Sequence, residues 1–165
     1  MNESPNKYKI WLAVYLAITA FIMVFIFVQS SLPDEASDEQ SEVFEAVLRE
    51  TVSTGFKIEP NHELIDFIVR KTAHMTEFGG LAVFVFLSLL EAIRVKRGYF
   101  RPKINLCILA GSIAIFYSVT DETHQLFVPG RVGSSFDIFV DSLGVVIAVA
   151  VIYLLITKIK EKNGQ

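Results

Sequence analysis

Long apolar stretches alternate with charged segments along the chain. The first stretch, residues 10–28, contains no charged side chain. As a helix rising about 1.5 Å per residue it would span about 29 Å, close to the roughly 30 Å hydrocarbon core of a bilayer. Three further stretches, at about 71–93, 104–119 and 138–156, are also mainly apolar. The pattern predicts an all-α fold, a four-span transmembrane helical bundle in which residues 1–165 form a single domain.

A cleaved signal peptide is the competing interpretation of the first stretch. The apolar core of such a peptide is normally about 7–15 residues long and is followed by small residues. Here the run is longer and ends in Phe27-Val-Gln-Ser-Ser-Leu-Pro33. We therefore interpret it as a retained span.

The loop between the first two spans, residues 29–70, has a pattern of its own. Its apolar positions first fall on one face of a short helix that Gly55 could end: Val43, Phe44, Val47, Leu48 and Val52. A second short helix is expected after Pro60, with Asn61 as its N-cap and apolar positions at Leu64, Ile65, Phe67 and Ile68. The loop is interpreted either as two amphipathic helices lying at the outer membrane surface or as a lid over a polar site.

Lysine and arginine gather in both terminal tails and in the loop after the second span: Lys7, Lys9, Arg94, Lys96, Arg97, Arg101, Lys103, Lys158, Lys160 and Lys162. The loop after the first span is instead acidic, with Asp34, Glu35, Asp38, Glu39, Glu42, Glu45, Glu50 and Glu59. Cytoplasmic loops of membrane proteins carry the excess of Lys and Arg. We expect a multi-pass protein with cytoplasmic N- and C-termini, and with the acidic loop and residues 121–137 outside.

Composition narrows the class further. The chain is 52% hydrophobic with 14 phenylalanines, and its mean hydropathy is +0.47, which suits spans without a separate soluble domain. The single cysteine, Cys107, excludes an internal disulfide and a thiolate zinc cluster, and we interpret it as a small core residue. No glycine-rich phosphate loop and no basic tract interleaved with aromatic residues occurs. The bilayer is thus the expected partner, and a nucleic acid is not.

Ionisable and amide side chains crowd one set of span ends: His74, Glu77, Asp121, Glu122, His124, Gln125, Arg131, Asp137 and Asp141. A charge at the centre of a membrane helix costs roughly 2.5–3.5 kcal/mol on insertion scales and is usually kept for function. Helical spacing of three or four residues places several of them on shared faces, in the sets Arg70–His74–Glu77, Asp121–Gln125 and Asp137–Asp141. The pattern predicts a polar site that opens to the extracytoplasmic side.

The candidate catalytic residues are His74, Glu77, Asp121, His124, Asp137 and Asp141. Either histidine could act as a general base, because its reference pKa of about 6.5 suits that chemistry. The candidate substrate-binding residues are Arg70, Glu122, Gln125, Arg131 and Ser30. Arg131, with Arg70 and Lys71, could hold a phosphate or carboxylate.

Two further roles stay open at this point. Ser30 or Ser31 could supply a nucleophile, or the two serines could simply form the C-terminal end of the first helix. Histidines and carboxylates are numerous enough to bind a divalent ion, although their spacing matches no recognised zinc pattern, so metal and cofactor are not assigned. The plain alternative is a hydrogen-bond network that joins the helices. Glycines at Gly79, Gly80, Gly111 and Gly144 predict close helix contacts, within one chain or in a dimer.

Three sequence blocks resemble the VanZ-like family of small bacterial membrane proteins. They are Phe27 to Pro33; Arg70-Lys-Thr-Ala-His-Met-Thr-Glu-Phe78; and Asp121-Glu-Thr-His-Gln-Leu-Phe-Val-Pro-Gly-Arg131 with Asp137 and Asp141-Ser-Leu-Gly144. The resemblance implies a cell-envelope protein of Gram-positive bacteria with a role in low-level antibiotic resistance to teicoplanin and related lipoglycopeptides. Where the family often has Tyr this chain has Glu77, and where Asn is common it has Asp141. Both differences add negative charge, which favours a cation or proton role.

The resemblance brings no settled reaction, so three functional hypotheses follow. The first is a resistance protein whose site acts on or binds a lipid-linked cell-wall intermediate, or the lipoglycopeptide itself, at the outer leaflet. The second is a membrane-embedded hydrolase or transferase. The third is a lipid-binding or transport module without catalysis.

Overall fold

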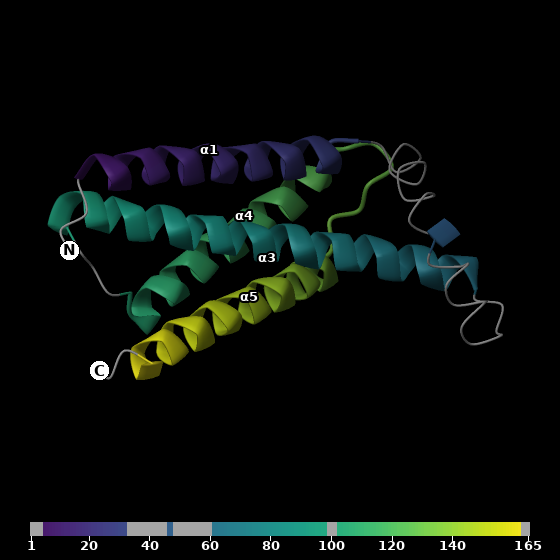
Figure 1. The fold of residues 1–165 in the computed structure, drawn as a ribbon. Coiled ribbons are helices and arrows are strands. Elements are labelled where there is room, and N and C mark those ends of the chain that lie inside the picture. The colour runs from purple at the N-terminus through teal and green to yellow at the C-terminus, as the bar shows by residue number, and fades with distance from the viewer. Residues whose placement is uncertain (1–4, 33–45, 48–60, 99–101, 163–165) are drawn as a thin grey trace.

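The computed structural model describes residues 5–32, 46–47, 61–98 and 102–162. Its long helices, labelled as in Figure 1, are α1 (Pro5–Ser30), α3 (His62–Arg97), α4 (Ile104–Gln125) and α5 (Ser135–Lys162). No strand occurs in these ranges. Each of the four helices is long and apolar enough to cross a membrane. The predicted all-α, four-span bundle is therefore confirmed.

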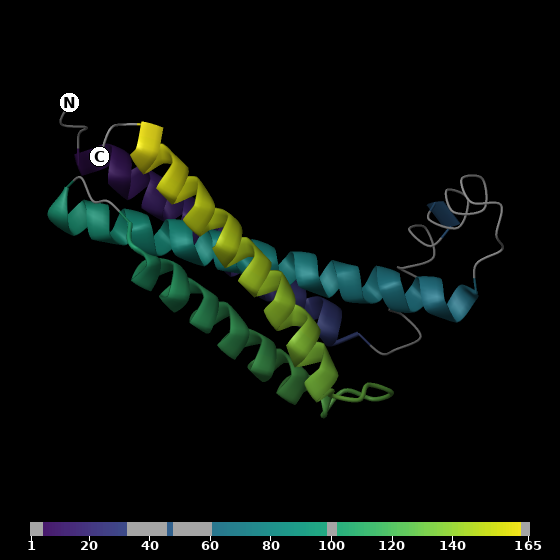
Figure 2. The ribbon, with the colours of Figure 1, turned by 90° about the horizontal axis from the view of Figure 1, so that it is seen from below.

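Helix α3 is the centre of the bundle. It packs against α1, α4 and α5, and α4 also packs against α5, while α1 touches α4 only slightly. The start of α1, the end of α3, the start of α4 and the end of α5 lie at one end of the bundle (Figures 1 and 2). This end carries the Lys- and Arg-rich segments, so the segregation of charge along the sequence is also a segregation in space.

Helix α3 begins well before the apolar stretch that the sequence marks as a span. The separate short helix expected after Asn61 is wrong, because those residues form the first turns of α3. No glycine or proline stands between Asn61 and Phe78 to interrupt the helix. Asn61 does act as the N-cap, since its side-chain oxygen accepts a hydrogen bond of 3.0 Å from the backbone N–H of Glu63.

The 36 residues of α3 make a helix of roughly 54 Å, much longer than a hydrocarbon core. Its N-terminal turns extend past the other helices (Figures 1 and 2). The loop predicted over residues 29–70 is correspondingly shorter. The helix expected between Val43 and Gly55 lies, apart from residues 46–47, outside the described residues, and so does the lid assigned to it.

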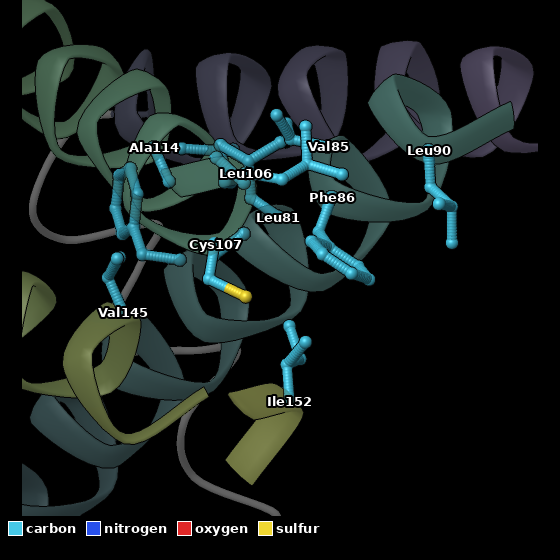
Figure 3. Packing of buried hydrophobic residues seen from close by; sticks show 13 residues of the cluster. Leu81, Val85, Phe86, Leu90, Leu106, Cys107, Ala114, Val145 and Ile152 are labelled. Carbon is cyan, nitrogen blue, oxygen red and sulfur yellow. The ribbon is translucent and has the colours of Figure 1, made fainter. Parts of the chain in front are cut away.

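The apolar core lies where α3 meets the other helices (Figure 3). Phe78, Ala82 and Cys107 are fully buried there, so the reading of Cys107 as a core residue is confirmed. Large apolar side chains on the outer faces are exposed, among them Phe21, Phe116, Val146 and Leu154. An apolar exterior of this extent suits contact with lipid tails rather than with water.

Helices α3 and α5 approach each other closely at a glycine. A Cβ atom at Gly144 would overlap the backbone carbonyl group of Met75, and one at Gly79 would lie 3.1 Å from the carbonyl oxygen of Gly144. At Gly111 the nearest atom, a Val149 methyl, would be 3.0 Å away. Gly80 has no such neighbour within 4 Å. Close packing within the chain is therefore confirmed at three of the glycines, and Gly80 is the exception.

A tight connection between α4 and α5 follows from local sequence. Gly130 adopts a positive φ of 79°, a conformation in which Pro129-Gly130 can reverse the chain. Ser134 then caps α5, because its hydroxyl oxygen accepts a 3.2 Å hydrogen bond from the Phe136 N–H. The start of α5 is thereby held beside the end of α4.

Candidate polar site within the bundle

The ends of α1 and α4 and the start of α5 lie at one level of the bundle, which α3 passes in its middle (Figure 1). Polar side chains from all four helices are in contact at this level. We call this group the polar cluster, defined as Ser30, Lys71, His74, Glu77, Ser118, Asp121, Glu122, Gln125, Asp137 and Asp141. Most of the hydrogen bonds and ion pairs that join its members run between helices, whereas Gln125 bonds to two acids of its own helix.

Asp141 is the deepest acid of the polar cluster. Its side chain is 0% exposed, and its Oδ2 accepts a 2.7 Å hydrogen bond from the Ser118 hydroxyl of α4. Its Oδ1 faces His74 Nδ1 of α3 at 3.7 Å, which is too long for a hydrogen bond. Neither of these two buried atoms has a hydrogen-bond partner among the described residues. A histidine and a carboxylate therefore face each other, each with unused hydrogen-bonding capacity.

Lys71 and Asp137 form the outer edge of the polar cluster. Lys71 Nζ lies 2.6 Å from Asp137 Oδ1, and each side chain is 21% exposed. The ammonium group also lies 5.6 Å from the centre of the Phe67 ring. Asp137 lies one helical turn before Asp141 on α5, and Lys71 lies three residues before His74 on α3. The site thus grades from a partly exposed ion pair to a fully buried acid.

A second group of contacts holds the end of α4. The Ser30 hydroxyl at the end of α1 donates a hydrogen bond to Asp121 Oδ1 and also lies 2.7 Å from the Ile26 carbonyl oxygen. Gln125 Nε2 donates to Asp121 Oδ2 at 3.0 Å. Glu122 Oε2 accepts a 2.8 Å hydrogen bond from the Ser134 N–H. These three α4 side chains are buried and mainly connect α4 to α1 and to the α4–α5 turn.

Charge interactions tie these contacts into one electrostatic unit. His74 interacts with Asp121, Asp137, Lys71 and Arg131, and Asp121 also interacts with the partly buried Glu77. Carboxyl groups outnumber cationic side chains in the polar cluster. In a medium of low dielectric such an excess favours either bound protons or a cationic or hydrogen-bond-donating ligand group.

Three of the predicted residues lie apart from the inner part of the polar cluster. Arg70 makes a 3.8 Å ion pair with Asp66, one turn earlier on its own helix. Arg131 Nε donates a 3.1 Å hydrogen bond to the Leu32 carbonyl at the end of α1. His124 packs against Phe27, with 4.5 Å between ring centres. The structure thus favours His74 over His124 as the histidine that faces an acid.

The structure bears on the two roles that the sequence leaves open, a serine nucleophile and a metal site. Ser30 donates to a carboxylate of the polar cluster rather than to a histidine, an arrangement that leaves it without the neighbouring imidazole expected of an activated serine. Within the ranges that the structure describes, no three His, Cys, Asp or Glu side chains are grouped so that they could hold a metal ion. The facing His74–Asp141 pair has only two such ligands.

The model of the VanZ/LLP1 family matches residues 14–156, which include all of α3 and α4, most of α1 and α5, and every member of the polar cluster. The chain belongs to the VanZ/LLP1 family. No curated protein and no solved structure matches the chain.

Sequence reasoning on this VanZ/LLP1 chain missed one member of the polar cluster. Ser118 was passed over as an apolar-span residue, although it lies three residues before Asp121 and seven before Gln125, on the same helical face. That spacing was the available signal. The partner of Lys71 was also missed, because only the packing of α3 on α5 brings Asp137 to it.

Proposed function

We propose that this VanZ/LLP1-family membrane protein contributes to low-level resistance to teicoplanin and related lipoglycopeptides. It does so by receiving the polar group of a lipid or lipid-linked cell-wall intermediate in the polar cluster, at the extracytoplasmic side of the membrane. The observation that carries the proposal is the unsatisfied His74–Asp141 pair at the base of the polar cluster. The resistance role comes from the family resemblance, and the site comes from the geometry.

A network that only joined helices would be expected to satisfy its own buried atoms. A buried polar atom without a partner costs about 1–3 kcal/mol. His74 Nδ1 and Asp141 Oδ1 each carry such a cost among the residues described. A ligand hydroxyl could donate a hydrogen bond to Asp141 Oδ1 and accept one from His74 Nδ1, which would recover that energy on binding. Sugar hydroxyls of lipid-linked cell-wall intermediates have this chemistry.

The outer edge of the polar cluster suits the charged part of such a ligand. Lys71 and Arg131 both interact with His74 through their charges. Their positive charge favours a phosphate close to the edge, while the acids favour donor groups deeper in. The charge pattern of the loops supports an outward-facing site, since the Lys- and Arg-rich segments are at the opposite end of the bundle.

A hydrolase or transferase is the second candidate, and the same pair of residues favours it. A histidine next to a buried carboxylate is the arrangement by which enzymes orient a general base. Asp141 would fix the His74 ring, and a ligand hydroxyl or water would lose its proton to the imidazole. A binding or transport module without catalysis is the third candidate and needs only the complementarity described above.

Resistance measurements on matched variants test the proposal. We expect His74→Gln and Asp137→Asn to lower the teicoplanin concentration that the cells survive to the level of cells lacking the protein. Glu63→Gln, which changes an exposed acid on the same helix, is the matched control and should keep full resistance. The amount of each variant in the membrane is measured in parallel. If all three variants keep full resistance at equal amounts in the membrane, the polar cluster is not needed for resistance and the proposal is refuted.

Lipid extracts from the same cells separate the candidates. A lipid species that accumulates in the His74→Gln cells alone would favour the enzyme. Unchanged lipids together with lost resistance would favour binding or transport.

A further inference from the structure

A polar pocket lies at the end of the bundle opposite the polar cluster, between the start of α1 and the last turns of α3. Its volume is about 190 Å³, and its lining residues are Lys7, Tyr8, Trp11, Tyr15, Glu91 and Arg94. The polar cluster contributes no residue to it. The pocket is therefore a separate feature of the molecule.

Two adjacent side chains in this pocket have unused hydrogen-bonding capacity. The Glu91 side chain is only 7% exposed, and its Oε1 accepts a 2.6 Å hydrogen bond from an Arg94 guanidinium nitrogen, NH1. Glu91 Oε2 and Arg94 Nε are both buried and have no hydrogen-bond partner in the part of the chain that is described. The pocket thus offers one charged acceptor and one charged donor to a ligand.

Aromatic rings form the α1 side of the pocket. Trp11 and Tyr15 stack with 5.6 Å between ring centres, and Tyr8 is buried beside them. Aromatic faces attract ammonium groups, and Trp and Tyr are favoured at the membrane interface. Lys7 adds a positive charge to the lining. The pocket therefore carries groups that suit a cation, the Glu91 carboxylate and the aromatic rings, and groups that suit an anion, Arg94 and Lys7.

We propose that this pocket binds a phosphoethanolamine group, an ammonium joined to a phosphate, as carried by the headgroup of an aminophospholipid. The ammonium N–H groups donate to Glu91 Oε2 beside the Trp11 and Tyr15 rings. The phosphate oxygens accept from Arg94 Nε and are attracted by Lys7. A single bridging water would fill only a small part of the pocket, since water occupies about 30 Å³ in the liquid.

The chain contains a single tryptophan, Trp11, so tryptophan emission reports on this pocket directly. The full chain is purified in an uncharged maltoside detergent and titrated with short-chain lipids that differ only in headgroup. We expect a saturable emission change with the ethanolamine lipid at a concentration about tenfold or more below that needed for the glycerol lipid, because a charge-assisted hydrogen bond is lost in the latter. Free phosphoethanolamine is titrated as well. A response to it identifies a soluble ligand, and a response to the lipid alone identifies the headgroup.

Two variants assign the preference to the residues named. Glu91→Gln should bring the ethanolamine and glycerol lipids to within about twofold of each other, and Arg94→Gln should weaken both. Glu63→Gln, at the far end of α3, is the control and should bind as the unmodified chain does.

Three results would overturn the proposal: no saturable emission change, equal affinities of the unmodified chain for the two lipids, or a preference that survives in folded Glu91→Gln. Equal affinities are the result expected if Lys7 and Arg94 serve only to orient the protein by their charge. The headgroup comparison on the unmodified chain decides the matter even if a variant fails to fold.

Discussion

Replacing Gly144 by alanine probes the contact that sets the spacing of α3 and α5. The added Cβ would overlap the carbonyl oxygen, the carbonyl carbon and the Cα of Met75. All three are backbone atoms, so no side-chain rotation can make room and α3 itself must move. His74 and Asp141 lie one and three residues from the two contact points. The same movement would therefore disturb the pair at the base of the polar cluster.

The expected size of the effect follows from two opposing terms. Alanine gains about 1 kcal/mol over glycine in a helix interior. Overpacking a close contact costs typically 1–3 kcal/mol, and a clash with backbone belongs at or above the upper end. We therefore expect Gly144→Ala to lower the free energy of unfolding by about 2 kcal/mol or more. Gly80→Ala is the matched control on α3, because a Cβ there meets nothing within 4 Å, and it should be neutral or gain up to about 1 kcal/mol.

Unfolding in mixed detergent micelles, followed by helical circular dichroism, measures both variants against the unmodified chain. The resistance assay is run on the same pair, and only Gly144→Ala should lose resistance. The reasoning is refuted if the two variants are equally stable. It is also refuted if Gly144→Ala is destabilised as expected but retains full resistance at an equal amount in the membrane, since the His74–Asp141 spacing would then not matter.

Three further experiments each test a single contact by the same unfolding assay. Ser118→Ala leaves Asp141 Oδ2 buried without its hydrogen bond and should cost about 1–3 kcal/mol; a neutral result would mean that water replaces the hydroxyl. A double-mutant cycle on Lys71 and Asp137, using Lys71→Met and Asp137→Asn, should give a coupling of about 1 kcal/mol that falls with added salt, and a coupling near zero would contradict a stable ion pair. Asn61→Ala removes the N-cap of α3 and should cost about 0.5–2 kcal/mol, whereas no change would show that the first turns are not part of the cooperative fold.

Much of the fold could be predicted because membrane insertion imposes simple rules. Lipid requires long apolar helices, and the loops keep their positive charges on one side, so the spans and their order can be read directly from composition. The exact extent of α3 could not be predicted in this way. Its first turns, from Glu63 to Arg70, carry three charged side chains, so the sequence indicates a separate short amphipathic helix. The helical spacing of Leu64, Ile65 and Ile68 nevertheless continues into the span.

The members of the candidate site were predictable, and their pairing was not. A helical repeat shows which side chains share a face, but the register between helices depends on close contacts such as that of Gly144 with Met75. Lys71 consequently pairs with Asp137, while Arg70 turns toward Asp66 on its own helix. His124 is the residue before Gln125, so its side chain is turned about 100° around the helix from the face that Asp121 and Gln125 share. It packs against Phe27 instead.

Labelling of introduced cysteines in intact cells tests most directly whether the polar cluster opens to the outside of the membrane. In a Cys107→Ser background, Phe127→Cys places a thiol in the α4–α5 turn, where the native side chain is 81% exposed, and Arg97→Cys places one in the last turn of α3 at the other end. We expect a membrane-impermeant maleimide to label the Phe127→Cys protein in intact cells and the Arg97→Cys protein only after permeabilisation. The reverse pattern would put the polar cluster on the cytoplasmic side and contradict the proposed function.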